Sequence, residues 1–160
     1  MINWQWKKFE QLSARDLYAI LQVRETVFVI EQQCIYQDID DLDKKAWHLI
    51  GWDVKDSKTA EIVAYLRVIY PTYKYIEPAI GRILTLKKMR GTGLGKKLLT
   101  LALSKIGSEF PHQAIRISAQ LQLKEFYTQF GFSQLSKPYD EDGILHIEML
   151  KTLPSEISET

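Results

Sequence analysis

Cysteine, net charge and long apolar runs are all scarce in this chain. Its one cysteine, Cys34, excludes a disulfide within the chain and suits a reducing compartment. The formal net charge is only +1, whereas dedicated nucleic-acid-binding proteins carry a large basic excess. No stretch approaches the roughly 18 apolar residues of a membrane-spanning helix, and residues 4–8 lack the apolar run of a signal peptide. We therefore expect a cytoplasmic protein that binds neither nucleic acid nor a membrane.

Side chains that could hold a metal are also few. The three histidines and Cys34 show no metal-ligand spacing, so no metal site is expected. The 160 residues are 46% hydrophobic and 26% charged, without repeats or low-complexity segments, as in one ordinary globular domain. We predict a single domain over residues 2–152 and a disordered tail over residues 153–160.

The most informative segment is Arg90–Lys97, with the sequence RGTGLGKK. It lies between an apolar, strand-like run at 80–86 and a helical pattern at 94–106. The alternating glycines leave backbone N–H groups accessible, and the start of the helix adds the positive end of its dipole. A strand, a glycine-rich turn and a helix N-terminus together form an anion site, for which phosphate is the usual ligand. The segment therefore predicts a phosphorylated ligand.

Residue spacing excludes two common phosphate motifs. A P-loop needs a glycine five residues before the glycine of Gly-Lys and a Ser or Thr after the lysine, but Arg90 and Lys97 occupy these positions. The dinucleotide pattern G-x-G-x-x-G fails because its third glycine would be Lys96 or Leu98. The segment instead fits the pattern R-x-x-G-x-G, beginning at Arg90.

A second motif follows the glycine-rich segment. Residues 115–120 alternate like a strand, and residues 126–132 end a predicted helix at Gly131, a residue favoured at helix C-termini. Tyr127 and Phe132 complete a Tyr-x-x-x-Gly-Phe pattern around this glycine. The two motifs, in this order, resemble the pyrophosphate loop and the late strand–helix unit of the GNAT superfamily of N-acetyltransferases.

Three further segments narrow the resemblance to the ElaA-type branch of this superfamily: residues 21–40, 80–82 and 139–147. The resemblance spans about residues 2 to 150 and implies an enzyme that uses acetyl-CoA as co-substrate. Such an enzyme transfers the acetyl group to a primary amine, on a small molecule or a peptide, by direct attack in a ternary complex. The alternative is an acyl-CoA-binding sensor or regulatory module without significant catalysis. The 4 Trp and 8 Tyr would suit a homodimer interface.

The order of strand-like and helical patterns predicts an α/β (α+β) fold with a mixed sheet and helices on both faces. The resemblance implies that this sheet is mostly antiparallel and splayed at the cofactor site. Strands are expected at residues 2–8, 48–52, 61–70, 80–86, 114–119 and 145–150. Helices are expected after a capping box at Ser13–Asp16, at 94–108 and at 121–130.

The resemblance also implies which residues hold the cofactor. The backbone of Ile83, Leu84 and Thr85 would pair with the pantetheine arm. The N–H of Leu84 would polarise the thioester carbonyl, an effect often worth about 3 kcal/mol per donor. Gln120 stands where many members of the family have Asn. The loop residues expected at the pyrophosphate are Arg90, Gly91, Thr92, Gly93, Leu94, Gly95 and Lys96.

Tyr127 is the candidate general acid, because a phenol stays protonated at neutral pH yet can protonate a strongly basic leaving group. The alternative is a packed aromatic side chain. An alkylammonium acceptor also needs a base, and Glu31 and His146 are candidates. Glu31 shares a predicted helical face with Arg24 and Phe28, and His146 lies opposite the core side of its strand. Alternatively, Glu31 pairs with Arg24, and His146 is structural.

An acidic cluster follows the first helix and consists of Glu31, Asp38, Asp40, Asp41 and Asp43. In GNAT enzymes this region usually shapes the acceptor pocket. A cluster that faces the thioester would attract a cationic amine, such as a polyamine, an amino sugar or a lysine side chain. The alternative is a solvated acidic loop.

Overall fold

The computed structural model describes residues 1–153 and contains one mixed sheet covered by helices. The strand order is β1-β2-β3-β4-β5-β8-β6, with β7 also pairing with β8, and every pair except β4–β5 is antiparallel. This arrangement confirms the predicted fold class. The strands are β1 (Ile2–Lys8), β2 (Ala46–Val54), β3 (Ala60–Ile69), β4 (Ala79–Thr85), β5 (Ile115–Gln120), β6 (Ser133–Gln134), β7 (Tyr139–Glu141) and β8 (Ile144–Lys151).

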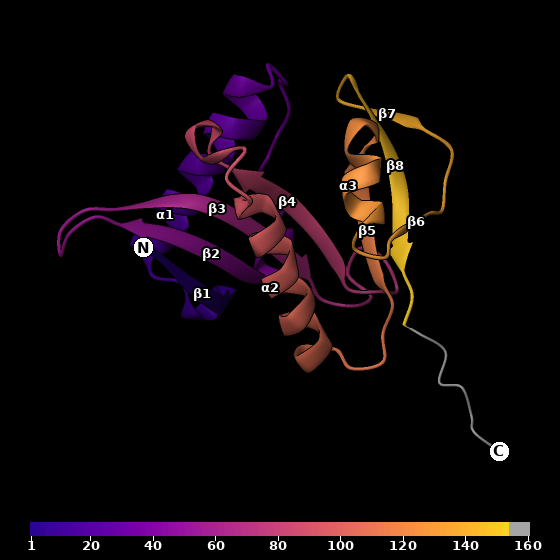
Figure 1. Cartoon of the computed structure of the whole chain (residues 1–160), viewed down its shortest axis with the longest axis horizontal. Helices are drawn as coiled ribbons and strands as arrows, with labels where there is room; N and C mark the ends of the chain where they lie inside the picture. Colours follow the sequence, from indigo (N-terminus) through magenta and orange to yellow (C-terminus); the bar gives the residue numbers. More distant parts are fainter. Residues whose placement is uncertain (154–160) are drawn as a thin grey trace.

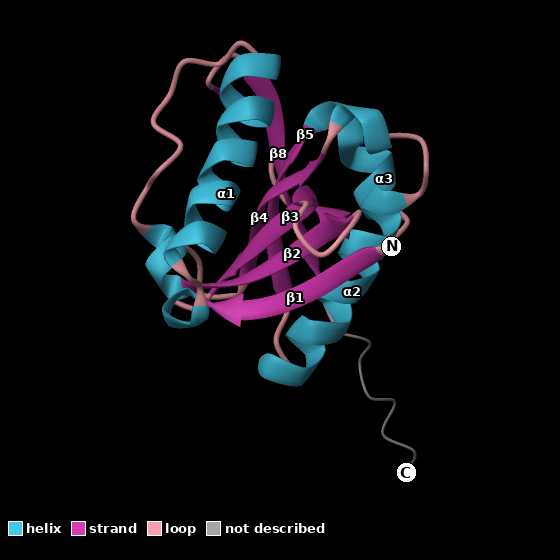
Figure 2. Ribbon diagram, turned by 90° about the vertical axis from the view of Figure 1, so that its left-hand side faces the viewer, coloured by secondary structure: helices cyan, strands magenta, loops and turns pink. Residues whose placement is uncertain are grey.

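The helices cover both faces of the sheet, as predicted (Figures 1 and 2). Helix α1 (Ala14–Arg24) packs on one face, where Ile20 and Val23 contact a buried group that includes Ile50. Helices α2 (Leu94–Glu109) and α3 (Lys124–Thr128) contribute to the larger cluster on the opposite face. Of the inner residues expected on α2, Leu94, Leu98, Ala102 and Ile106 are buried, whereas Leu101 is partly buried and Leu99 is buried as well. Burial of each leucine or isoleucine side chain contributes about 1.5–3 kcal/mol.

The first helix begins as its sequence predicts but continues differently. The Ser13 hydroxyl accepts a bond of 3.0 Å from the Asp16 N–H, and the Asp16 carboxylate accepts one of 3.1 Å from the Ser13 N–H. After Arg24 the chain forms a π-helical segment, Glu25–Glu31. The i→i+5 bonding of a π-helix changes the direction of successive side chains relative to an α-helix. Arg24 and the residues of the π-helical segment therefore do not lie on the common face that α-helical spacing predicts.

The sheet divides between β4 and β5. These parallel strands form only two residue pairs, Ala79 with Arg116 and Ile80 with Ile117, and then diverge (Figure 1). On its other edge β4 carries a bulge opposite β3, where the register shifts and Arg82 adopts a left-handed φ of 51°. The splayed sheet implied by the family resemblance is thus confirmed. We refer below to the space between the diverging strands as the fork.

The later part of the chain differs in detail from the sequence-based elements. The helix predicted at 121–130 is a 3-10 turn over Leu121–Leu123 followed by the short α3. Strands β6 and β7 were not predicted, and both pair with β8. Of the predicted tail, residues 154–160 lie outside the described part of the chain. Among the described residues no helix combines the length and the apolar character that crossing a membrane requires.

Candidate active site

A cavity of about 290 Å³ lies in the fork. Its walls come from the segment after α1, from β4 at the bulge, and from the β5, α3, β7 and β8 side. The cavity thus joins segments that are distant in the sequence. The polar side chains that we use below are Lys74, Arg82, Ser118, Gln120, Tyr127, Glu141 and His146.

Tyr127 lines this cavity from α3 and is 4% exposed. Its ring packs against Phe126 and Phe132, with centroids 5.2 and 6.2 Å away. Gly131 ends the helix at a φ of 92°, as the sequence predicted, and the Phe132 N–H returns to the Tyr127 carbonyl at 3.3 Å. Within residues 1–153 the Tyr127 hydroxyl forms no hydrogen bond, and burial raises its pKa. The hydroxyl is therefore held protonated in the cavity wall.

His146 lies across the cavity on β8, where it is paired with Gln120 of β5 and Tyr139 of β7. Its Nδ1 is 2.8 Å from the Ile144 carbonyl oxygen, so Nδ1 carries the proton and donates it. The neutral ring consequently has its lone pair on Nε2, 3.5 Å from the Glu141 carboxylate. This arrangement suits a proton acceptor whose charged form is stabilised by a carboxylate.

Glu31 and Arg24 do not form the pair that the sequence suggested. Arg24 is fully buried and turns into the core, where it contacts Asp38 and Asp43. Glu31 instead accepts a hydrogen bond from Arg90, the first residue of the glycine-rich loop. The π-helical segment between Arg24 and Glu31 accounts for the difference, because it changes the direction of the later side chain. Glu31 thus connects the end of this segment to the loop.

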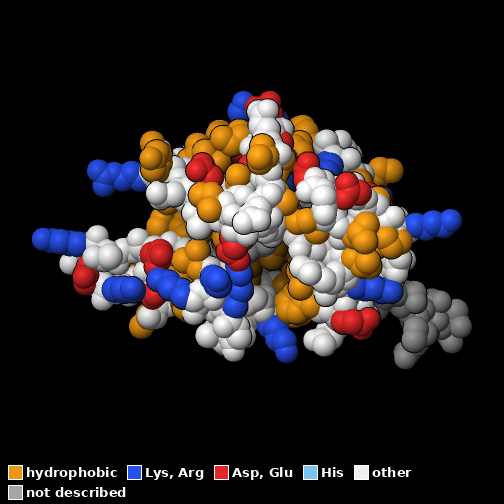
Figure 3. All heavy atoms as spheres, turned by 90° about the horizontal axis from the view of Figure 1, so that it is seen from above, with side chains coloured by type: hydrophobic (Ala, Val, Ile, Leu, Met, Phe, Trp, Pro, Cys, Tyr) orange, Lys and Arg blue, Asp and Glu red, His pale blue; other side chains and the backbone are white. Residues whose placement is uncertain are grey.

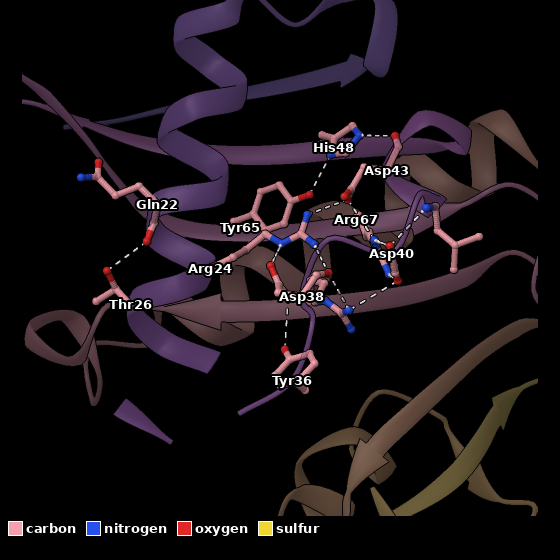
Figure 4. A network of polar contacts seen from close by, with 12 residues as sticks. Gln22, Arg24, Thr26, Tyr36, Asp38, Asp40, Asp43, His48, Tyr65 and Arg67 are labelled. Carbon is pink, nitrogen blue, oxygen red and sulfur yellow. Dashed lines mark hydrogen bonds and ion pairs between the residues drawn. The ribbon is translucent and has the colours of Figure 1, made fainter. Parts of the chain in front are cut away.

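The acidic cluster is largely neutralised by arginines (Figure 4). Neither alternative derived from the sequence, a free anionic surface or a solvated loop, describes Asp38, Asp40 and Asp43. Of the four aspartates only Asp41 is exposed, in a pair with Lys44. The contacts are Arg24 to Asp38 at 2.9 Å and to Asp43 at 2.6 Å, Arg67 to Asp40 at 2.5 Å and to Asp43 at 2.9 Å, and Arg82 to Asp38 at 2.8 Å.

These contacts keep the carboxylates charged. Burial alone would raise the pKa of Asp40, but the hydrogen bonds and charge of Arg67, with the charge of Arg82, lower it to about 2. The pKa of Asp43 is also lowered. Burial would raise it, but the charges and hydrogen bonds of Arg24 and Arg67 have the larger effect. The three aspartates are matched by three arginines, so this group of six residues offers no net negative charge to a cationic acceptor.

His48, the other strand histidine, belongs to the same buried network. Its Nε2 lies 2.9 Å from the Asp43 carbonyl oxygen and therefore donates to it, so Nδ1 accepts from the Tyr65 hydroxyl at 2.7 Å. Burial lowers the pKa of His48, which favours this neutral form. Both ring nitrogens are satisfied and the side chain is fully buried, so His48 is a structural residue.

The glycine-rich loop has the geometry of an anion site. Gly91 and Gly93 adopt φ angles of 81° and 85°, and Gly93 caps α2. The first bond into the helix runs from the Lys97 N–H to the Gly93 carbonyl at 3.1 Å, so the N–H groups before it lack helical partners. A Cβ at either glycine would meet no atom within 4 Å, and Lys96 is exposed nearby. Open space, backbone donors and a cation together fit a pyrophosphate group.

The backbone of β4 provides a second part of a cofactor site. Leu86 donates its N–H to the Val63 carbonyl of β3 at 2.9 Å, and Leu84 is the register partner of Tyr65. Because N–H groups alternate along a strand, Leu84 also faces β3, whereas Ile83 and Thr85 face the fork. Ile83 additionally lines the cavity. The alternation therefore favours Ile83 over Leu84 as a backbone donor toward a bound thioester.

The left-handed backbone conformation of Gly93 allows a test of its contribution to stability. We expect Gly93→Ala to lower the free energy of unfolding by about 1 kcal/mol, because a Cβ is strained at this φ. Gly107→Ala is the matched control within α2, where alanine is the better helix former and should stabilise by about 0.5–1 kcal/mol. Urea unfolding of the two variants gives the comparison. Equal effects would contradict the strain argument.

Several residues of the cavity were not identified from the sequence. Ser118 could have been, because Ile115, Ile117 and Ala119 alternate with it and are buried on the opposite side of β5. Its hydroxyl is hydrogen-bonded to Tyr139, whose ring stacks on His146. Lys74 comes from the β3–β4 connection, which has no periodic pattern, and Glu141 ends the three-residue strand β7, which is too short for one. Among residues 1–153 no group of three or more His, Cys, Asp or Glu side chains is arranged to hold a metal ion.

Known proteins share this sequence and this fold. A family model described as an acetyltransferase (GNAT) domain matches residues 14–153. A UPF0039 protein of Synechocystis sp. is 42% identical over 96% of this chain and 97% of its own length, and the protein ElaA of Escherichia coli is 39% identical over 94% and 97%.

Two crystal structures share the fold of this chain. An acyl-CoA N-acyltransferase from Pseudomonas aeruginosa superimposes with a TM-score of 0.88 at 34% identity, covering 95% of this chain and 100% of that one. The structure of E. coli ElaA gives a TM-score of 0.87 at 37% identity, with coverage of 94% and 99%. The region matched by the family model, residues 14–153, contains the glycine-rich loop, the strands of the fork and the Tyr127 helix. This chain therefore belongs to the GNAT acetyltransferase family and is similar to ElaA and the UPF0039 proteins.

Proposed function

We propose that this protein is an N-acetyltransferase that moves an acetyl group from acetyl-CoA to a primary amine in a ternary complex. Membership of the family implies acyl-CoA-dependent acyl transfer. The observation that supports catalysis in this chain is that the Tyr127 side chain and His146 line one cavity in the fork. A protein that only sensed acyl-CoA would require the loop but neither of these side chains. The free thiol of Cys34 suits a cytoplasmic location.

The cofactor would be held by two backbone surfaces described above. The loop would bind the pyrophosphate, and the backbone of β4 at Ile83 and Thr85, where the Thr85 carbonyl accepts from Arg90, would bind the pantetheine arm. The acetyl thioester supplies the group to be transferred. Gln120, at the end of β5, also lines the cavity; its Oε1 accepts from Gln122, and its amide NH2 would orient the arm. The loop residues assigned to the pyrophosphate are Arg90, Gly91, Thr92, Gly93, Leu94, Gly95 and Lys96.

Two protons must leave the acceptor nitrogen during the transfer, and one proton must reach the departing thiolate. The acceptor is an ammonium ion at neutral pH, and His146 Nε2 would take its proton so that the amine nitrogen can attack the acetyl carbonyl carbon. The bond from that carbon to sulfur then breaks, and the Tyr127 hydroxyl would give its proton to the departing thiolate. The Ile83 N–H faces the fork and would stabilise the negative charge that develops on the carbonyl oxygen. Loss of a proton from the product nitrogen allows Tyr127 to be reprotonated.

The base assignment has a distinct pH signature. We expect His146→Gln to lower kcat/KM by about 100-fold near pH 7, because the acceptor must then lose its proton to water. This deficit should shrink as the pH approaches about 10, where an alkylamine is increasingly neutral in solution. The rate of thiol release measured across this range, with wild type and variant compared at each pH, tests the assignment.

Glu31→Gln is the comparison variant, because Glu31 is the other candidate base. Its carboxylate is paired with Arg90, so we propose that it positions the loop and that its loss weakens cofactor binding without changing the pH dependence. A pH-dependent deficit in Glu31→Gln, together with a pH-independent one in His146→Gln, would transfer the base role to Glu31.

The activity itself is tested by thiol release from acetyl-CoA over a panel of amines, with cofactor binding measured by calorimetry on the same protein. Release that depends on an acceptor supports the proposed function. Tight binding of acetyl-CoA without release over any amine would favour the alternative, a sensor on a GNAT fold. Absence of binding would contradict the assignment of the Arg90–Lys96 loop.

A further inference from the structure

Opposite walls of the fork cavity carry charges of opposite sign. One wall is formed by β3, the β3–β4 connection and the bulge of β4, which contribute Arg67, Lys74 and Arg82 respectively. The facing wall is formed by β7, its turn and β8, which contribute Glu141 and the neighbouring Asp142 and His146. On this side of the molecule acidic, basic and hydrophobic side chains are intermixed (Figure 3).

The cationic wall has a charge without a partner. Within residues 1–153 the Lys74 ammonium forms no ion pair and no hydrogen bond, and its contact is with the ring of Tyr75 at 5.7 Å. Lys74 is an exposed residue that lines the cavity, so its ammonium is accessible to a ligand. An anion beside Lys74 would give this ammonium a charged partner.

The Asp40 carboxylate on this wall is already bound by arginines. Asp40 accepts from Arg67 at 2.5 and 2.8 Å and lies 3.4 Å from Arg82. Arg67 is 1% exposed, and its Nε has no hydrogen-bond partner among residues 1–153. This Nε is shielded from solvent, so it is not a donor to the cavity. The arginine charges on this wall are matched by aspartates, which leaves Lys74 as its unpaired cation among residues 1–153, and a polyamine there would add a further cation.

The facing wall suits an ammonium group instead. Glu141 supplies a carboxylate 3.5 Å from His146 Nε2, whose lone pair faces it. An ammonium between the two would donate to both, and it would stand beside the base that removes its proton. The cavity of about 290 Å³ is small for a ligand site, which limits the acceptor to the size of a small metabolite.

We propose that the acceptor is a small zwitterion of the amino-acid type, whose carboxylate binds at Lys74 and whose amine binds at Glu141 and His146. This inference rests on the proposed function, because it names the substrate class of the same site. It replaces the cationic acceptor suggested by the sequence, since the aspartates behind that suggestion are neutralised by arginines. Lys74 is then the residue that determines specificity, without a part in the proton transfers.

The test compares three matched sets of acceptors: α-amino acids, their α-amides and the corresponding decarboxylated amines. We expect wild type to favour the amino acid over its amide by about 10- to 100-fold in kcat/KM, the effect of one charge-assisted hydrogen bond. Lys74→Met should remove this preference by raising KM for the amino acid while the amide is unaffected. Lys58→Met, in the exposed β2–β3 turn, is the matched control and should change neither value.

A second measurement separates this inference from the proposed function. Calorimetry with the amino acid and its amide, on protein saturated with coenzyme A, reports acceptor binding without turnover. Preferential binding of the amino acid that is lost in Lys74→Met supports the inference even if no thiol is released, an outcome that would contradict only the proposed function. Equal binding of acid and amide, or equal losses in Lys74→Met, would overturn the zwitterion and leave acetyl transfer to another amine intact.

Discussion

Tyr127→Phe is expected to lower kcat by at least 100-fold while leaving the Kd of acetyl-CoA unchanged. The departing thiolate loses its proton donor, and general acid catalysis contributes about 10²- to 10⁴-fold. The phenyl ring keeps the contacts with Phe126 and Phe132, and the hydroxyl has no hydrogen bond within residues 1–153. The substitution therefore removes a proton without opening a cavity in the core. Thiol release at saturating substrates, with calorimetry for the cofactor, measures both quantities.

Tyr18→Phe provides the control, because it makes the same chemical change on a side chain that is 73% exposed on α1. It should leave kcat and Kd unchanged. If Tyr127→Phe also retained wild-type turnover, Tyr127 would be only a packed aromatic residue and another group would have to protonate the thiolate.

Asp43→Asn is expected to have the largest effect on stability, a loss of about 3–5 kcal/mol in the free energy of unfolding. Asp43 contacts Arg24 at 2.6 Å and Arg67 at 2.9 Å, and both guanidinium groups are almost completely buried. Removing one negative charge leaves two buried cations with incomplete compensation, although the shape of the side chain is retained. Urea unfolding of the variant measures the loss.

Asp41→Asn is the matched control in the same loop. Its carboxylate is exposed and pairs with Lys44 at 3.3 Å, an arrangement that contributes less than about 1 kcal/mol. Similar losses in the two variants would show that the loop tolerates charge removal anywhere and that the network is not a major source of stability.

Local patterns in the sequence were sufficient for the conformation of the loop and for the end of the Tyr127 helix, whereas the role of Tyr127 was available only through the resemblance. A helix start and a glycine C-cap are determined by neighbouring residues, and Gly131 ends its helix as predicted. The sheet order and its fork were available only through the resemblance to a family. Strand pairing depends on residues far apart in the chain, for which periodicity gives no partner.

The charged network and the cavity walls required the three-dimensional structure. Arg24 pairs with Asp38 across 14 residues, and Arg82 with Asp40 across 42, so sequence distance gave no indication of either contact. α-Helical spacing suggested a pair between Arg24 and Glu31, but the π-helical segment between them changes the phase of the side chains. Lys74 lines the cavity from an irregular connection and Glu141 from the three-residue strand β7, and in neither place does a pattern distinguish a site residue from a solvated one.

The two residue pairs that join β4 to β5 also bear on how the chain folds during synthesis. Strands β1 to β4 are contiguous in sequence and pair with one another, and so are β5 to β8. Each half of the sheet can therefore form from its own stretch of chain as that stretch leaves the ribosome, before the other half is available. The fork is the boundary between these two halves of the sheet, although one buried cluster joins them, and a ligand bound across the fork contacts both. We therefore expect strand pairing during synthesis to occur in two successive steps, with the shared core completed only when the second half is available.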